Sequence, residues 1–220
     1  MISGGIEGGE MIAAGLRNGA TAIALLAGAA TAQACEGSTV LFEDDFSELK
    51  STWEVADNDV RVEDNRMIVS PAADFSVWVP NATSVYDDID MCADVTTVEA
   101  VDPKNNFVGL VFWYVDDKNF YAAEFDANKS ASIWRKQRGK WLKQIDWTKV
   151  SYLRGGDKAT NQLRVVTVGK QASFYINGTK FNQIQGVPPD NGQEIGVIAS
   201  SPEKGAATYA FANFRITKPE

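Results

Sequence analysis

The feature that most constrains the fold is a series of short apolar segments that runs from about residue 38 to the end of the chain. Each segment is rich in Val, Ile, Phe, Tyr or Trp and is bounded by Gly, Asn, Asp or Pro. β-Branched and aromatic residues favour strands, and the boundary residues favour turns. No segment after residue 38 sustains the 3.6-residue apolar period of a helix. The pattern therefore predicts an all-β fold.

The turns between these segments indicate antiparallel pairing. Asn177-Gly178 is a two-residue hairpin signal, because both residues tolerate positive φ. Further turns predict a meander from Phe107 to Ile145, and many short strands at this spacing are typical of a β-sandwich or jelly roll. The expected strands are Val40–Glu43, Trp53–Ala56, Val60–Glu63, Arg66–Ser70, Phe75–Val79, Ile89–Val98, Phe107–Val115, Phe120–Asp126, Ala131–Lys136, Trp141–Ile145, Gln162–Val168, Gln171–Ile176, Glu194–Ala199 and Ala207–Thr217.

Composition excludes several kinds of site. The chain contains no histidine, which removes the usual general base at neutral pH, Ser-His triads and most zinc sites. Its formal net charge is −8 and it has no basic stripe, so a nucleic acid is not an expected partner. We expect no cofactor and no metal, and the sequence leaves the oligomeric state open.

The N-terminal region has the features of a secretion signal. Ala20–Ala30 is a short apolar run that follows Arg17, and it ends in a small-x-small pattern at Ala34. The run is too short for a membrane span, which needs roughly 20 residues. Met11 is a better start than the first residue, because the ten residues before it are acidic and glycine-rich. We predict cleavage after Ala34 and a periplasmic or secreted protein.

The remaining residues, 35–220, are expected to form a single domain that contains both cysteines, Cys35 and Cys92. In an oxidising compartment, two cysteines favour one disulfide, and two unpaired thiols are the alternative. Cleavage after Ala34 would make Cys35 the new N-terminus. Lipoprotein anchoring at Cys35 is therefore a second, less favoured interpretation.

A series of motifs extends over about residues 40–217. They are Leu41–Phe46 with Trp53, Phe107–Trp113 with Asp116–Tyr121, Gly139–Trp141, Asn161–Leu163, Phe174–Gly178, Gly196–Ile198 and Phe211–Phe214. In this order they resemble the concanavalin A-like lectin/glucanase superfamily, and within it they most resemble the laminin-G-like and 3-keto-disaccharide hydrolase-like domains. The resemblance implies an antiparallel β-sandwich whose concave sheet binds ligands. Ala212 stands where the closing motif often has Asp, which weakens any structural cation site beside Asp44 or Asp45.

Strand alternation then selects residues for the concave face. The resemblance places Phe112 in the core, so Trp113 is expected on the concave side. On the next two strands, the same alternation places Glu124 and Trp134 outside. An indole ring offers a flat platform to a sugar, and a carboxylate accepts hydrogen bonds from its hydroxyl groups. The expected ligand-binding residues are Trp113, Phe120, Glu124, Trp134 and Lys136, whereas Trp53, Trp78, Trp141 and Trp147 are expected to be packing residues.

Three functions remain open. The first is an exported domain that binds a glycan on its concave face. The second is a glycoside hydrolase of the 3-keto-disaccharide hydrolase-like type. Its expected catalytic residues are Glu124 and Asp126, which form half of the Glu-x-Asp-x-(x)-Glu set of related glycosidases. The third is a structural or adhesion domain of the cell envelope that has no small ligand.

Overall fold

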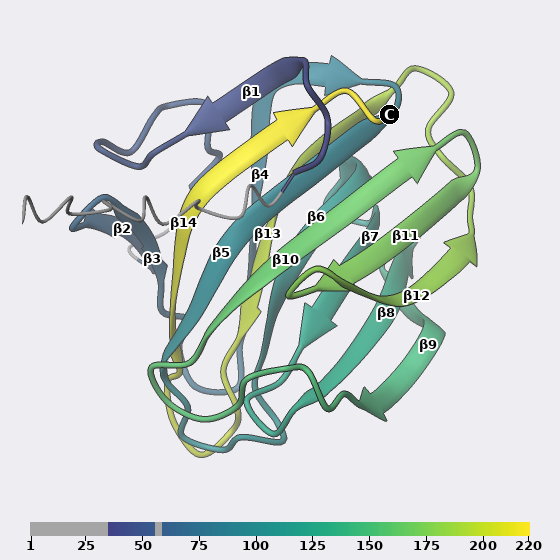
Figure 1. Cartoon of the computed structure of the whole chain (residues 1–220). Coiled ribbons are helices and arrows are strands. Elements are labelled where there is room, and N and C mark those ends of the chain that lie inside the picture. Colours follow the sequence, from purple (N-terminus) through teal and green to yellow (C-terminus); the bar gives the residue numbers. More distant parts are fainter. Residues whose placement is uncertain (1–34, 56–58) are drawn as a thin grey trace, which may run out of the picture. The chain divides into compact units, whose positions relative to one another are not determined.

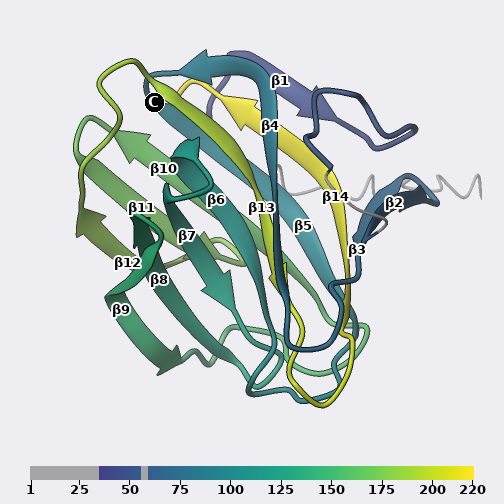
Figure 2. The same cartoon turned by 180° about the vertical axis from the view of Figure 1, so that it is seen from behind.

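The computed structural model describes residues 35–55 and 59–220; the expected signal peptide over residues 1–34 lies outside this part of the chain. The described residues form two antiparallel sheets packed face to face. Figure 1 shows them from the side of the eight-stranded sheet, and Figure 2 from the side of the six-stranded sheet.

The eight-stranded sheet has the order β12-β11-β10-β5-β14-β3-β2, with β1 paired to β14. The six-stranded sheet has the order β4-β13-β6-β7-β8-β9. The bounds in the first sheet are β1 Val40–Asp44, β2 Val60–Glu63, β3 Arg66–Val69, β5 Ile89–Glu99, β10 Thr160–Val168, β11 Gln171–Ile176, β12 Thr179–Gln185 and β14 Thr208–Thr217. The bounds in the second are β4 Ser76–Tyr86, β6 Phe107–Asp116, β7 Asn119–Phe125, β8 Ser130–Gln137, β9 Lys140–Lys149 and β13 Gln193–Ser200.

The expected all-β antiparallel sandwich is confirmed, with two differences in the strands. The predicted strand at Trp53–Ala56 is wrong: Trp53 makes a single bridge to Asn81, and residue 56 lies outside the described residues. Strand β12 was not expected, because its sequence is mostly polar and lacks an apolar run. It forms because the Asn177-Gly178 turn, with φ of 51° and 77°, returns the chain alongside β11.

The main core fills the space between the two sheets. Strand β6 contributes Val108, Leu110 and Phe112 from the six-stranded sheet, and the facing sheet contributes residues such as Val95 and Phe211. All five side chains are almost completely buried. A second apolar cluster lies on the opposite side of the six-stranded sheet. We call that side the outer face.

The two cysteines close the N-terminal segment onto the eight-stranded sheet. Cys35 and Cys92 form a disulfide, with Cα atoms 5.5 Å apart. Beside it, Asp90 accepts hydrogen bonds from the backbone N–H groups of Glu36 and Gly37 and from the guanidinium of Arg164. Within the described ranges, no helix has the length and apolar character of a membrane span.

Candidate functional site

A cavity of about 360 Å³ opens on the outer face of the six-stranded sheet. Most of its wall is aromatic, and a single carboxyl group, that of Glu124, lies among its lining residues in the described part of the chain. Strands β6, β7, β8 and β9 supply all but one of these residues. The cavity is lined by Ser76, Phe107, Glu124, Trp134, Trp141 and Trp147.

Glu124 lies on β7, where regular alternation directs it to the outer face while Ala123 and Phe125 enter the main core. Its side chain is 2 % exposed and receives no hydrogen bond or ion pair from the described residues. Burial alone raises its pKa from an ordinary value of 4.5 to about 8. Glu124 is therefore mostly protonated at neutral pH, and in that state it can both donate and accept a hydrogen bond.

The aromatic walls are held by specific contacts. The indole N–H of Trp134 donates to the hydroxyl oxygen of Ser132 at 3.1 Å. The Trp147 ring lies 6.1 Å from that of Phe107, measured between centroids. Trp141 is 39 % exposed, so the residue is partly open to solvent at the edge of the cavity. The cavity thus combines several apolar ring surfaces with one buried polar group, which is the usual composition of a small-molecule site.

A second cavity of about 440 Å³ adjoins the first, and both include Ser76 in their linings. It contains the carboxylates Glu54 and Asp117 and the ring of Trp78. The indole N–H of Trp78 donates to Asp117 at 2.7 Å, and this bond holds the pKa of Asp117 below its usual value. The hydroxyl group of Tyr114 donates to the same oxygen at 2.9 Å.

Phe120 and Lys136 also lie on the outer face, next to Trp78 rather than in the Glu124 cavity. Phe120 is 1 % exposed and packs against the rings of Trp78 and Trp141, with ring centroids 5.6 and 5.5 Å away. The Lys136 ammonium lies 3.7 Å from the centroid of the Trp78 ring, a cation–π contact. Burial lowers the pKa of Lys136. The ligand contacts expected of Phe120 and Lys136 stay predictions.

The expectation that Trp113 faces the ligand is wrong. Its side chain is 2 % exposed and packs in the main core. In the β6–β13 ladder, Val111 pairs with Gly196 and Tyr114 pairs with Glu194, so β6 has one more residue than β13 between these two pairs. Trp113 lies in this stretch and has a φ of 48°. This bulge breaks the alternation, so Trp113 turns inward and Tyr114 takes the outer position.

The expected pairing of Glu124 with Asp126 on one face is also wrong. Asp126 lies in the turn after β7, where its carboxylate accepts the backbone N–H of Ser130 at 2.7 Å. It does not line the Glu124 cavity. Burial, and then the charge of Asp126, raise the pKa of Tyr209, a core residue of the opposite sheet. Asp126 is therefore held in the turn after β7 and does not share the cavity with Glu124.

Sequence reasoning missed Trp141 and Trp147 as cavity residues. Both lie on β9, whose ladder with β8 shifts register on either side of Ile133, the residue that pairs with Ile145. Regular alternation would place Trp141, Ile145 and Trp147 on the same face of the sheet, but Ile145 packs toward the main core. The sequence does contain one indication of the cavity, because three tryptophans lie within residues 134–147. Regular strand alternation alone does not place all three on one face.

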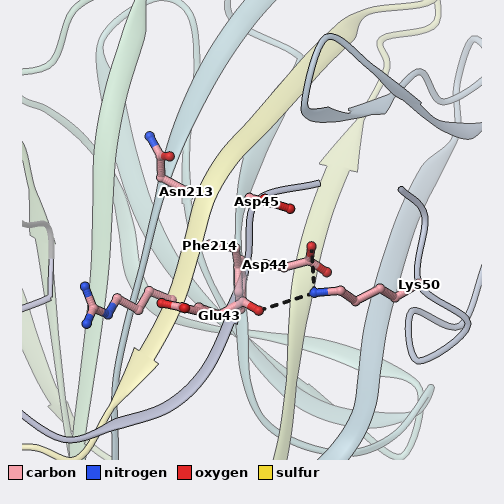
Figure 3. A pocket seen from close by; sticks show the side chains of 7 residues that line it. Glu43, Asp44, Asp45, Lys50, Asn213 and Phe214 are labelled. Carbon is pink, nitrogen blue, oxygen red and sulfur yellow. Dashed lines mark hydrogen bonds and ion pairs between the residues drawn. The ribbon is translucent and has the colours of Figure 1, made fainter. Parts of the chain in front are cut away.

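An acidic corner with the side chains of Glu43, Asp44 and Asp45 lies near β1 (Figure 3). Asp44 is buried there and accepts the backbone N–H of Phe46 and the indole N–H of Trp53, both at 2.9 Å. The Lys50 ammonium lies 3.1 Å from the same carboxylate. The carboxylate of Asp45 accepts the backbone N–H of Ser47 at 3.0 Å. No group of three acidic or thiol side chains in the described residues is placed to hold a metal ion.

A scan against models of protein families finds no match, and neither does a search of curated protein sequences. Solved structures do match. The carbohydrate-binding module CBM66 from Bacillus subtilis has a TM-score of 0.61 and 15 % identity, covering 76 % of this chain and 96 % of its own. Bacillus licheniformis β-glucanase has a TM-score of 0.59 and 12 % identity, covering 80 % and 97 %.

The fold is the concanavalin A-like jelly roll. A protein of unknown function with a galectin-like fold, from Bacillus subtilis, is also similar, with a TM-score of 0.63 and 11 % identity over 84 % of this chain and 98 % of the other. The resemblance found in the motifs from Leu41 to Phe214 is thereby confirmed at the level of fold. The chemistry of the site has to be argued from its own residues, because a fold does not determine a function.

Proposed function

We propose that this protein binds a carbohydrate on the outer face of its six-stranded sheet. The observation that carries the proposal is the Glu124 cavity, in which three indoles and one phenyl ring surround a buried carboxyl group. Indole faces pack against the C–H faces of a pyranose, and a buried polar group with no partner in the described residues gains when a hydroxyl group pairs with it. The volume of about 360 Å³ falls in the range of small-molecule sites, roughly 300–1,000 Å³.

The comparison with CBM66 supports the same function, because that structural neighbour is named as a carbohydrate-binding module. The cavity also favours a ligand-binding role over a purely structural envelope or adhesion domain. A structural domain gains nothing from a buried carboxyl group without a partner, since such a group lowers stability.

A glycan array with the purified protein, followed by calorimetric titration of the best ligand, tests the proposal. Trp134→Ala removes one wall of the cavity and is expected to weaken binding about tenfold, which corresponds to ~1.4 kcal/mol. Tyr175→Ala is the matched control, because Tyr175 is an aromatic residue on β11 in the other sheet. No binding to any glycan, or equal affinity for both variants and the original protein, would contradict the proposal.

Glycoside hydrolysis is a second candidate, and one observation favours it. A carboxyl group whose pKa is raised to about 8 is protonated at neutral pH, as a general acid must be. Two-carboxylate mechanisms also need a second carboxyl group about 5 to 9.5 Å away, and the described lining of this cavity contains none. Glu124→Gln assayed on 3-keto disaccharides and common glucans decides the matter: full activity in this variant excludes Glu124 as the acid.

We further propose that the protein is exported to the periplasm or the medium. The Cys35–Cys92 disulfide supports this localisation, because disulfides persist in oxidising compartments. A sulfur atom held in a disulfide cannot also carry a lipid thioether, so the pairing argues against a lipoprotein anchored at Cys35. Mass spectrometry of the protein recovered from its native cell tests both points: a chain that retains residues 1–34, or a lipid on Cys35, would contradict them.

A further inference from the structure

We infer that the carbohydrate bound in the Glu124 cavity is cationic, a sugar that carries a protonated primary amine. In this arrangement, the ammonium group lies between the carboxylate of Glu124 and the faces of the surrounding indole rings. The inference rests on the proposed function and narrows it from carbohydrates in general to amino sugars with a free amine.

The first support is the absence of any cation beside Glu124 among the described residues. In the sheet, Glu124 is flanked by Gly109 on β6 and by Ser132 on β8. The other lining residues of the cavity are one serine and four aromatic residues, none of which carries a charge. The cations nearest to the cavity walls do not reach Glu124. The Lys136 ammonium lies 3.7 Å from the centroid of the Trp78 ring and 5.5 Å from that of the Trp141 ring. Lys143, opposite Trp134 in the β8–β9 ladder, forms an ion pair with Asp146 at 2.7 Å. When Glu124 ionises, its counter-charge therefore has to come from the ligand.

The second support is the chemistry of the walls. The faces of aromatic rings carry negative potential, and they attract a cation within about 6 Å of the ring centre. Trp134, Trp141 and Trp147 are the strongest such rings among the natural side chains. A neutral sugar uses these rings only through its C–H groups, whereas a protonated amino sugar gains from the rings and from the carboxylate together.

The third support is that negative charge continues into the adjoining cavity. Glu54 is exposed there and has no ion pair with a described residue, while Asp117 lies opposite Trp78. Burial, and then the charge of Glu54, raise the pKa of Glu194. Lys136 offsets part of this charge near Asp117. An oligomer of amino sugars that extends past Ser76 would place its next ammonium group near Glu54.

Binding of a cation has a measurable consequence for Glu124. In the free protein its carboxyl group is mostly protonated below pH 8, and pairing with an ammonium group requires the ionised form. Binding at pH 6 therefore releases about one proton for each ligand bound, by linkage between the two equilibria. A neutral sugar that hydrogen-bonds the protonated group releases none.

The test uses three matched probes: the β-1,4-linked tetramers of glucosamine, N-acetylglucosamine and glucose, which differ at carbon 2. They are titrated calorimetrically at pH 6 in two buffers with different protonation enthalpies. The glucosamine tetramer is expected to bind at least about tenfold more tightly than the other two, with release of about one proton. Glu124→Gln is expected to abolish both the preference and the proton release. Glu99→Gln, an exposed glutamate on β5, is expected to retain both.

Failure of the inference is distinguishable from failure of the proposed function. Equal affinity for the three tetramers, or tighter binding of a neutral one, overturns the inference and upholds carbohydrate binding. Binding of none of them also overturns it; the glycan array then decides whether carbohydrate binding survives. If Glu124→Gln still binds the glucosamine tetramer more tightly than the neutral tetramers, Glu124 does not recognise the amine and the inference is wrong. Proton release on binding of the glucosamine tetramer is measured in the unmodified protein. The inference can therefore be tested even if Glu124→Gln does not fold.

Discussion

Replacing Glu124 with Gln is expected to change how the stability of the protein depends on pH. In the unfolded chain this carboxyl group titrates near 4.5, and in the folded protein burial raises its pKa to about 8. Between these values the unfolded state binds fewer protons than the folded state, so the free energy of unfolding falls as pH rises. The contribution of Glu124 is fully present below pH 4.5 and is lost by about pH 8. Gln has no proton to lose and removes this dependence.

The size of the effect follows from the same two values. Each pH unit between the two pKa values changes the free energy of unfolding by about 1.4 kcal/mol. The interval from 4.5 to about 8 therefore gives an upper limit of about 5 kcal/mol. Water that enters the cavity solvates the carboxylate and reduces this value. The glutamine variant is expected to gain stability relative to the original protein as pH rises, by several kcal/mol at pH 8 and above.

Urea unfolding at a series of pH values from about 4.5 to 9 measures this difference. Other groups with raised pKa values, such as Asp126 and Glu194, contribute equally to both proteins and cancel in the comparison. Glu99→Gln serves as the control, because this glutamate is exposed at the end of β5. A difference between Glu124→Gln and the original protein that stays within about 0.5 kcal/mol over the whole range would refute the burial argument.

Two further predictions concern the supports of the fold. Gly186→Ala places a methyl group 2.2 Å from Cζ3 of Trp113, so urea unfolding is expected to show a loss of about 1–3 kcal/mol; unchanged stability would mean that the Trp113 ring is not fixed in the core. Replacing Cys35 and Cys92 together with Ser opens a link across 57 residues, and the loop-closure relation gives a loss of about 4 kcal/mol. Thermal unfolding with and without reductant measures this loss, and insensitivity of the original protein to reductant would contradict it.

Much of the sandwich can be predicted from the sequence, because strands and turns depend on neighbouring residues. The alternation of β7 places Glu124 outside and Phe125 inside, and both positions are as expected. The Asn177-Gly178 turn fixes its hairpin through the positive φ of both residues. The disulfide was expected from cysteine count and compartment rather than from geometry, and it is present.

The position of Trp113 depends on residues far away in the sequence, and a prediction from the alternation of side chains along β6 does not include them. Its backbone N–H donates to the side-chain oxygen of Gln193 at 2.8 Å, and this bond lies at the bulge in the β6–β13 ladder. Because Gly186 has no side chain, it leaves room for the indole ring of Trp113. Neither partner is within 70 residues of Trp113 in the chain. A bulge therefore changed one side chain from the expected outer face to the core.

The irregular strands also explain why the outer face carries so many rings. A regular strand places only every second residue on a given face, but register shifts in β9 bring Trp141 and Trp147 to the outer face while Ile145 turns inward. The carboxyl group of Glu124 comes from the regular strand β7, so simple alternation predicts it. Alternation also predicts Trp134, but the positions of Trp141 and Trp147 depend on departures from alternation, which change the direction of side chains without a local sequence signal. The carboxyl group was therefore predictable from the sequence, whereas two of the aromatic residues that line the cavity with it, Trp141 and Trp147, were not.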